Sequence, residues 1–305
     1  MQTLAPIALF VYNRPDHTRR TLSYLQKNEL AAESRLFVFS DGPKTDADKP
    51  RVDEVRQLLE EVEGFKSVKV IEGDENKGLA NSIIAGVTQL IAEYGKVIVF
   101  EDDLLSSPYT LEYFNEALTK YANESDVMHI GAYMFDVADK GLPETFFYRI
   151  ATSWGWATWS RAWKSFEPDI DKLMAQFDKD KINRFSIDGT MNFWKQMQEF
   201  KAGKNNSWAI RWYASIFLKG GLVLNPSHSL IHNIGHDGSG VHSNIENTYQ
   251  VNIARKPVKQ FPAEIKENPR AHVAIRNFLA NRKGSLLKRG LVFIRQLRVK
   301  YLVKR

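Results

Sequence analysis

Residues 97–103 read VIVFEDD, an apolar run that ends in three consecutive carboxylates. A short run rich in β-branched residues, preceded by Gly95 and Lys96, is typical of a strand buried on both faces of a mostly parallel sheet. The carboxylates then lie at the carboxyl end of the strand, the edge where open α/β sheets bind ligands. Clustered carboxylates repel one another unless a cation neutralises them, and their hard oxygen atoms suit Mg²⁺ or Mn²⁺. The run therefore predicts an α/β fold with a cation and ligand site at this edge.

The acidic triplet has a second interpretation as a helix cap. Ser106, Ser107 and Pro108 follow it and are residues that often open a helix. The position of the triplet directly after a buried strand favours the ligand site.

Strand-like and helix-like segments alternate along the first third of the chain, which predicts a parallel sheet with crossover helices. We expect strands over 7–12, 35–39, 68–71 and 97–100, and helices over 16–27, 46–62 and 79–94. Beyond residue 121 the pattern becomes irregular and aromatic, and all seven tryptophans fall in 154–212. Tryptophans in so narrow a zone either fill a core or stack against sugar rings, and the sequence leaves both open.

The composition restricts the compartment and the partners. Among 305 residues there is no cysteine, so we expect neither disulfides nor thiolate metal sites, and a cytoplasmic location. The N-terminus lacks the pattern of a signal peptide, and no apolar stretch reaches the ~18 residues that a membrane span needs. The net charge is +6, but residues 282–305 hold nine Lys and Arg and no acid, which leaves 6 − 9 = −3 for the rest. A core that binds nucleic acid is therefore not expected.

The basic segment 282–305 has its own pattern. Apolar residues recur at spacings of three and four from Leu287 to Tyr301, with basic residues largely on the other faces. A basic amphipathic helix of this kind lies on anionic membranes, which predicts a peripheral position on the inner face of the plasma membrane. The alternative is a helix packed on its own domain or on a partner.

Polar landmarks follow one another in a fixed order along the first half. Asn13-Arg14-Pro15 follows the first strand, Asp41-Gly42 the second, and Asn76-Lys77-Gly78 precedes a helix, before the acidic triplet. From about residue 5 to about 245 this order resembles nucleotide-sugar-dependent glycosyltransferases of the GT-A fold, and within them the group related to N-acetylglucosaminyltransferase I. The resemblance implies a Rossmann-like, mostly parallel central sheet flanked by helices. It also implies a catalytic domain over 1–250, with a nucleotide-sugar half (1–120) and an acceptor half (121–250), and an extension over 251–305 carrying the basic helix.

The resemblance also implies site residues. The last acid, Asp103, would bind the Mn²⁺ or Mg²⁺ ion that bridges the donor diphosphate, and His242 in a late loop would be a further ligand, with His232 and His236 as weaker candidates. The implied contacts to the donor are Asn13, Arg14, Asp41, Asn76, Lys77, Asn81, Glu101, Asp102, Trp154, Gly155, Trp156, Trp208 and Arg211. For the glycine and asparagine residues among the landmarks, a turn or cap role is the alternative.

The catalytic base is not evident from the resemblance. Related enzymes place an acid directly after the first tryptophan of a segment that resembles 206–212, and here that position is Ala209. An inverting transfer needs a carboxylate that takes the proton of the acceptor hydroxyl. The candidates are Asp237, in a glycine-rich loop, and Asp188.

The sequence thus predicts a metal-dependent glycosyltransferase that moves a sugar, most simply from a UDP-sugar, to a hydroxyl of a glycan or lipid-linked glycan. We expect a role in cell-surface polysaccharide or glycoprotein glycan synthesis. Two alternatives stay open. A nucleotidyltransferase shares acids at strand ends, although Asn13-Arg14-Pro15 is a poor match to its phosphate loop, and Ala209 favours a noncatalytic glycan-binding protein.

Overall fold

The computed structural model describes residues 3–137, 141–236 and 249–282. Its first part confirms the predicted alternation of strands and helices, with boundaries within one helical turn of those expected. The elements are β1 (Ile7–Val11), α1 (Pro15–Leu25), β2 (Arg35–Ser40), α2 (Lys49–Glu60), β3 (Ser67–Glu72), α3 (Leu79–Tyr94) and β4 (Lys96–Glu101). Short 3₁₀ turns at Ala31–Glu33 and Asp46–Asp48 precede β2 and α2.

The later part contains more regular structure than its sequence pattern indicated. Its elements are β5 (Leu104–Ser106), α4 (Thr110–Lys120), β6 (Val127–Gly131), β7 (Thr145–Tyr148), β8 (Trp156–Trp159), α5 (Ser160–Trp163), α6 (Ile170–Met174), α7 (Lys179–Phe185), α8 (Phe193–Lys201), α9 (Trp208–Leu218), β9 (Leu222–Pro226), β10 (Ile231–Asn233) and α10 (Pro269–Asn281). Several of these strands are only three to five residues long, which leaves too few positions for a period of two to be recognised.

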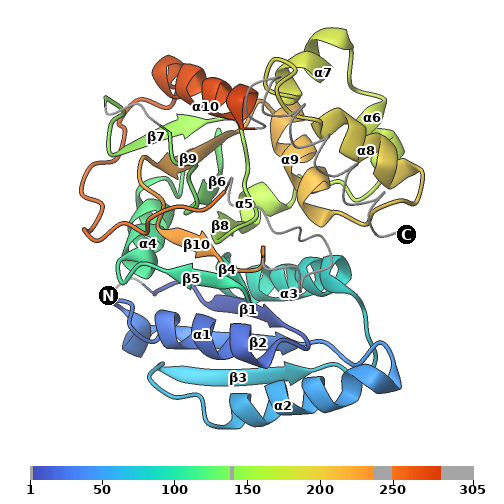
Figure 1. Cartoon of the computed structure of the whole chain (residues 1–305). Coiled ribbons are helices and arrows are strands. Elements are labelled where there is room, and N and C mark those ends of the chain that lie inside the picture. Colours follow the sequence, from blue (N-terminus) through green and yellow to red (C-terminus); the bar gives the residue numbers. More distant parts are fainter. Residues whose placement is uncertain (1–2, 138–140, 237–248, 283–305) are drawn as a thin grey trace, which may run out of the picture.

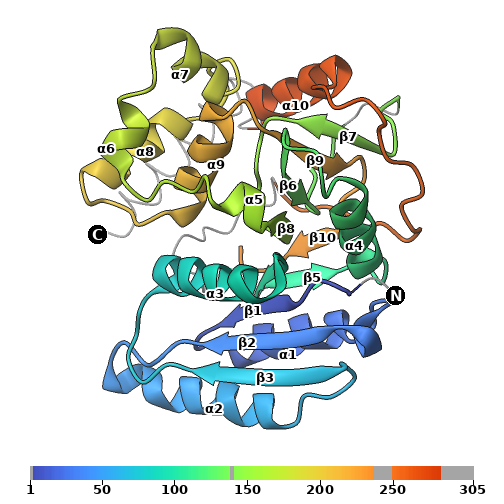
Figure 2. The ribbon, with the colours of Figure 1, turned by 180° about the vertical axis from the view of Figure 1, so that it is seen from behind.

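Eight strands form one sheet in the order β3-β2-β1-β4-β8-β6-β9-β7. The first four strands are parallel, and β6 and β9 run in the same direction, so only β8 and β7 are antiparallel to the rest. Figures 1 and 2 show this twisted sheet running from β3 at the bottom to β7 at the top. A separate pair, β5 with β10, lies beside the end of β4. The predicted mostly parallel α/β fold is confirmed.

Helices cover both faces of the sheet, and the side chains of β1 show why. Ile7, Leu9 and Val11 belong to the core shared with α1, α2 and α4, whereas Ala8 and Phe10 belong to the core shared with α3 and α9. Alternate residues of a strand point to opposite faces. A strand apolar at every position is therefore buried between two layers of helices.

Two glycines mark the ends of helix α3, which precedes β4. Helix α3 begins directly after Gly78 and ends at Gly95, whose φ of 74° is the left-handed conformation that terminates many helices. The Gly95 amide donates to the Ile91 carbonyl at 2.9 Å and closes the last turn. Strand β4 starts at the next residue, so this cap fixes where its acidic end lies.

Most of the tryptophans fill the core between the sheet and α9. Trp156, Trp163, Trp208 and Trp212 are all buried, and the rings of Trp156 and Trp208 stack with centroids 5.2 Å apart. The interpretation of these residues as core residues is therefore confirmed, and it follows from the large apolar area that each indole removes from water.

The described part of the predicted extension packs on the sheet. Helix α10 contacts β7 and buries Ala271, Ile275 and Leu279 there. Residues 283–305, with most of the predicted basic helix, lie outside the described residues. Among the residues described, no helix is long and apolar enough to cross a membrane.

Candidate functional site

The acidic triplet lies where β4 ends. Glu101 is the last residue of the strand, and Asp102 and Asp103 form the turn into β5. Helix α4 starts only at Thr110, after β5, so the triplet is not a helix cap and that interpretation is wrong. The Thr21 hydroxyl on α1 donates to the Asp102 carbonyl at 2.7 Å and ties the turn to the helix.

Arg14 faces these carboxylates from the end of β1. Its guanidinium pairs with the Asp102 carboxylate through Nη2 and through Nε, the latter at 3.3 Å, and Nη2 also lies 3.1 Å from Oδ2 of Asp103. Asp102 is buried, and the Asp103 side chain keeps 14% of its surface exposed. The structure thus brings together the predicted residues Arg14, Asp102 and Asp103.

The carboxylates perturb one another because they share a poorly solvated space. Burial raises the pKa of Asp102 to about 6; Arg14 opposes this shift and Asp103 adds to it. Burial and the two neighbouring aspartates also raise the pKa of Glu101 well above its usual range. For Arg14, burial lowers the pKa, but attraction to the two aspartates outweighs it, so the pKa is raised. Near neutral pH, Arg14 therefore keeps its positive charge beside Asp102, a carboxyl whose ionised form burial disfavours.

A second group of predicted residues forms one hydrogen-bonded loop at the start of α3. The Asp41 carboxylate accepts hydrogen bonds from the amides of Lys77 and Gly78, both at 2.9 Å. Asn76 donates to the Gly42 carbonyl at 2.9 Å, and Asn81 to the Lys77 carbonyl at 2.9 Å. These bonds give the four residues a shared loop-ordering role. Their contact with a nucleotide remains a prediction.

Asn13 lies on the same edge of the sheet, next to Arg14. Its side-chain amide donates to Oδ1 of Asp48, at 3.0 Å. The predicted residues that follow β1, β2 and β4 are thus gathered at the carboxyl ends of three adjacent strands, as expected for a parallel sheet.

The chain returns to the acidic turn at the end of β10. The Ile234 amide donates to the Asp103 carbonyl at 2.9 Å, and the amide of Gly235 donates to Oδ1 of Asn233 at 2.7 Å. Gly235 lies so close to Asp103 that a β-carbon there would come within 2.9 Å of Asp103 Cγ. Sequence reasoning did not relate these residues to the acidic turn, because nothing in the local pattern links Asp103 with Gly235, 235 − 103 = 132 positions later.

An aromatic cluster lies next to this segment of the chain. The ring centroid of Trp154 lies 4.5 Å from the ring centroid of Tyr133, 5.1 Å from that of His236 and 5.9 Å from that of Tyr249. Trp154, His236 and Tyr249 each keep part of their surface exposed. The neighbouring Gly155 has a φ of 68° and its β-carbon would lie 2.7 Å from Cγ1 of Ile231, so packing against β10 already requires glycine there.

Other predicted donor contacts lie in the interior. Trp156 and Trp208 are buried in the core described above, and Arg211 donates to the carbonyls of Ser207 and Pro168 at 3.3 and 3.2 Å. Ala209, where an acid was expected, lies in the first turn of α9. The burial of Trp156, Trp208 and Arg211 gives no support to their predicted contact with a donor.

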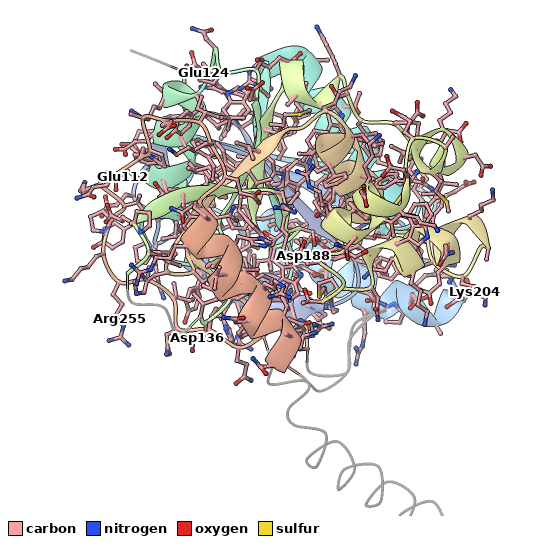
Figure 3. The ribbon with its side chains drawn as sticks, turned by 90° about the horizontal axis from the view of Figure 1, so that it is seen from above. Glu112, Glu124, Asp136, Asp188, Lys204 and Arg255 are labelled. Carbon is pink, nitrogen blue, oxygen red and sulfur yellow. The ribbon has the colours of Figure 1, made fainter. Side chains whose placement is uncertain are left out.

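The two candidate bases differ in what can be described. Oδ2 of Asp188 lies 2.9 Å from Nε2 of His272 on α10 and 3.6 Å from Nε of Arg276. Figure 3 shows where Asp188 lies in the molecule. Its φ of 50° follows one of 49° at Ile187, a conformation that β-branched residues rarely adopt. No hydrogen bond or ion pair within the described ranges joins Asp188 to the acidic turn. Asp237 and His242 lie outside the described residues.

The donor set at the acidic turn fits Mg²⁺ or Mn²⁺. The ligands offered are carboxylate oxygens, and in the described ranges no three His, Cys, Asp or Glu residues form a complete metal cage. These ions are commonly held by one or two carboxylates together with substrate phosphates, so an incomplete protein cage suits them. His236, one residue after Gly235, has a buried Nε2 without a hydrogen-bond partner among the residues described.

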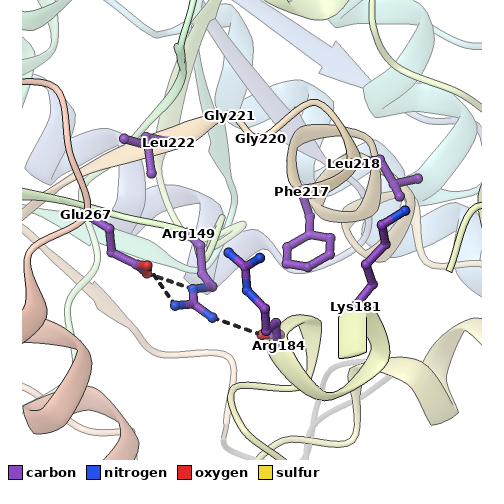
Figure 4. A pocket seen from close by; sticks show the side chains of 9 residues that line it. All are labelled: Arg149, Lys181, Arg184, Phe217, Leu218, Gly220, Gly221, Leu222 and Glu267. Atoms are coloured by element: carbon purple, nitrogen blue, oxygen red, sulfur yellow. Dashed lines mark hydrogen bonds and ion pairs between the residues drawn. The ribbon is translucent and has the colours of Figure 1, made fainter. Parts of the chain in front are cut away.

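The cavity drawn in Figure 4 lies elsewhere. It measures about 220 Å³ and lies where β9 begins, at the sheet edge opposite the carboxyl end of β4. Glu267 in its wall accepts two hydrogen bonds from Arg149, both at 2.7 Å. This cavity is therefore not part of the candidate site.

The mostly parallel sheet thus places ordered loops and a carboxylate pair at the carboxyl edge, where open α/β sheets bind ligands. The sequence matches the family described as glycosyl transferase family 2 over residues 7–192. The chain belongs to this family and is a glycosyltransferase. No curated protein matches the sequence.

Several solved structures are distantly similar to this chain. A mannosyltransferase from Pyrobaculum calidifontis, in complex with GDP-Man and Mn²⁺, is 12% identical, with a TM-score of 0.39 over 71% of this chain and 69% of that one. Residues 1–349 of S. aureus TarS are 13% identical, with a TM-score of 0.41 over 75% of this chain and 60% of that one. Mouse xyloside xylosyltransferase 1 is 14% identical, with a TM-score of 0.37 over 70% and 80%. At these values the family match identifies the chain, and the individual structures do not.

Proposed function

We propose that this glycosyltransferase moves a sugar from a uridine diphosphate sugar to a hydroxyl group of a glycan or lipid-linked glycan, with a divalent cation, Mn²⁺ or Mg²⁺. The observation that carries the proposal is the pair Asp102–Asp103 at the end of β4, facing Arg14 and flanked by the ordered loop at the start of α3. A relation to the N-acetylglucosaminyltransferase I group rests on the order of the sequence landmarks.

In this proposal each group has a defined task. Asp103 would hold the cation, which when bound supplies Lewis-acid stabilisation to the departing nucleoside diphosphate. Asp102 and Glu101 would contact the ribose or the sugar hydroxyls of the donor. Arg14 offers a planar fork of donors to the diphosphate oxygens. The amide-rich start of α3 adds a favourable dipole for phosphate.

The acceptor would lie on the other side of the turn. Trp154, Tyr249 and His236 present partly exposed rings next to the segment that contacts Asp103, and aromatic faces suit stacking on a sugar ring. An inverting transfer then needs a carboxylate to take the proton of the acceptor hydroxyl, and Asp237 and Asp188 remain the candidates.

Product analysis with a UDP-sugar and Mn²⁺ tests the proposal. Release of UDP from the UDP-sugar supports a transferase. Release of pyrophosphate from UTP and a sugar 1-phosphate, in a parallel assay, supports a nucleotidyltransferase. Absence of both reactions supports a noncatalytic glycan-binding protein. The Asp103→Ala variant should lose on the order of 100-fold or more in turnover while keeping its fold. Asp16→Ala, which removes an exposed carboxylate from α1, is the matched control. Metal-dependent turnover retained by Asp103→Ala would contradict the assignment.

The basic segment 282–305 suggests in addition a peripheral position on an anionic membrane, close to a lipid-linked acceptor. Flotation with vesicles rich in anionic lipid, comparing the full chain with a chain ending at Asn281, tests this part separately. Equal flotation of the two chains would exclude a role for the segment.

A further inference from the structure

Arg14 is placed so that its backbone is fixed while its side chain reaches the acidic turn. Its carbonyl accepts hydrogen bonds from the amide and hydroxyl of Thr18, at 3.0 and 2.9 Å, and Pro15 follows as the first residue of α1. The Arg14 side chain is 18% exposed, and its guanidinium contacts two aspartates whose side chains are more buried. The positive charge that compensates Asp102 and Asp103 therefore comes from the protein's own Arg14 side chain.

This arrangement sets up a competition for one oxygen atom. Nη2 of Arg14 lies 3.1 Å from Oδ2 of Asp103, the residue proposed to bind the divalent ion. A metal ion that approaches Asp103 meets a positive charge already in contact with the carboxylate. Arginine pairs with phosphate oxygens in the same bidentate geometry as with carboxylates, and its long side chain can turn toward a diphosphate without moving α1.

We propose that Arg14 is an internal counter-ion that occupies the carboxylates in the free enzyme and couples metal binding to donor binding. The metal alone binds weakly because it must displace Arg14. A nucleoside diphosphate gives Arg14 a new partner and thereby frees Asp103 for the metal. Coupling between two ligands is reciprocal, so Mn²⁺ must strengthen nucleotide binding by the same factor. This inference rests on the proposed function of the site.

Titrations with Mn²⁺ alone, with UDP alone and with both test the inference, using calorimetry and the electron paramagnetic resonance signal of free Mn²⁺. Arg14→Gln keeps a polar side chain at this position but removes its positive charge. We expect this variant to bind Mn²⁺ alone about tenfold more tightly than the wild type does. The factor by which UDP strengthens Mn²⁺ binding should fall below its wild-type value, which we expect within the ~5- to 150-fold typical of such coupling. The factor that remains comes from diphosphate oxygens that ligate the ion directly. Arg19→Gln, which removes an exposed arginine from the same helix, should leave both quantities unchanged.

Further variants cover the case in which Arg14→Gln fails to fold because Asp102 is left buried without its partner. Arg14→Gln combined with Asp102→Asn removes both charges, and it should bind Mn²⁺ alone more tightly than Asp102→Asn does. Equal or weaker binding of Mn²⁺ in the Arg14 variants overturns the inference. If the wild type binds no Mn²⁺ even with UDP present, the proposed metal-dependent donor site fails instead.

Discussion

The backbone of Gly235 lies directly against the carboxylate of Asp103, so that a β-carbon at residue 235 would approach Cγ of Asp103 to 2.9 Å. The adjacent amide of Ile234 donates to the carbonyl of Asp103 at 2.9 Å. The end of β10 thus holds both the main chain and the side chain of the acidic turn. The geometry of the site depends on this return of the chain as much as on β4.

Gly235→Ala should therefore impair catalysis more than folding. The added methyl group forces either the acidic turn or the end of β10 to move, and a shift of about 1 Å at a catalytic centre can cost ~100-fold in rate. Turnover with a UDP-sugar and Mn²⁺, measured together with the melting temperature, checks this. Gly203→Ala is the control, because its β-carbon would meet nothing within 4 Å and only its φ of 68° is unfavourable. Wild-type turnover in Gly235→Ala would show that the contact is dispensable.

The raised pKa of Asp102 predicts a specific dependence of stability on pH. Burial raises this pKa from 3.8 to about 6 in the folded protein, so the folded state binds the proton more tightly than the unfolded state. Relative to Asp102→Asn, the wild type should lose about 2–3 kcal/mol of unfolding free energy as the pH rises from 4 to 6.5, and little above that. Urea denaturation of both proteins at several pH values measures the difference. A difference that stays constant, or grows with pH, would contradict the prediction.

His129 predicts the opposite dependence. Its ring is buried, accepts a hydrogen bond from Trp212 at 3.1 Å and lies 3.1 Å from the Thr152 carbonyl, and burial lowers its pKa from 6.5 to about 3. The unfolded state then takes up the proton first, so stability is lost as the pH falls below 6.5. Between pH 7.5 and 5 the wild type should lose about 2 kcal/mol more than His129→Gln does, in the same denaturation experiment. Equal losses would mean that the folded protein protonates His129 freely.

Variants of Asp41 test whether the loop at the start of α3 contacts the nucleotide or is only an ordered part of the fold. Asp41→Ala removes the acceptor for the amides of Lys77 and Gly78, and should cost about 1–3 kcal/mol of stability together with UDP affinity. Asp41→Asn keeps one side-chain oxygen and should recover part of both. Calorimetric UDP binding and urea denaturation are the measurements. If Asp41→Ala binds UDP as the wild type does, the loop is not part of the donor site.

The identity of the base can be tested by two matched variants. We expect Asp237→Asn to lower kcat on the order of 100-fold or more with little change in KM, because the chain contacts Asp103 two residues earlier, at Gly235. Asp188→Asn should lower stability instead, because Asp188 already pairs with His272 and Arg276. A loss of kcat confined to Asp188→Asn would reverse this assignment.

Much of the fold was predictable because the first half of the chain is locally consistent. The strands buried on both faces are continuous apolar runs, and helices such as α3 carry apolar positions at helical spacing between glycines. Parallel strands joined by helices must bring their carboxyl ends to one edge. For that reason the acidic triplet could be assigned to a ligand-binding edge before any contact was known. The resemblance to GT-A glycosyltransferases added Asn13, Arg14 and Asp41 to the same site.

The sequence by itself determined the α/β class and the edge at which the acidic residues gather, because both follow from local periodicity and chain direction. Only the tertiary structure decided that Arg14 pairs with Asp102 and Asp103 and that Gly235 lies against Asp103. It also decided that Trp156 and Trp208 are buried in a core and do not line an exposed binding surface. These outcomes depend on contacts between segments far apart in the chain. No local pattern records such contacts, because packing and the burial of charge select them only when the whole sheet is assembled.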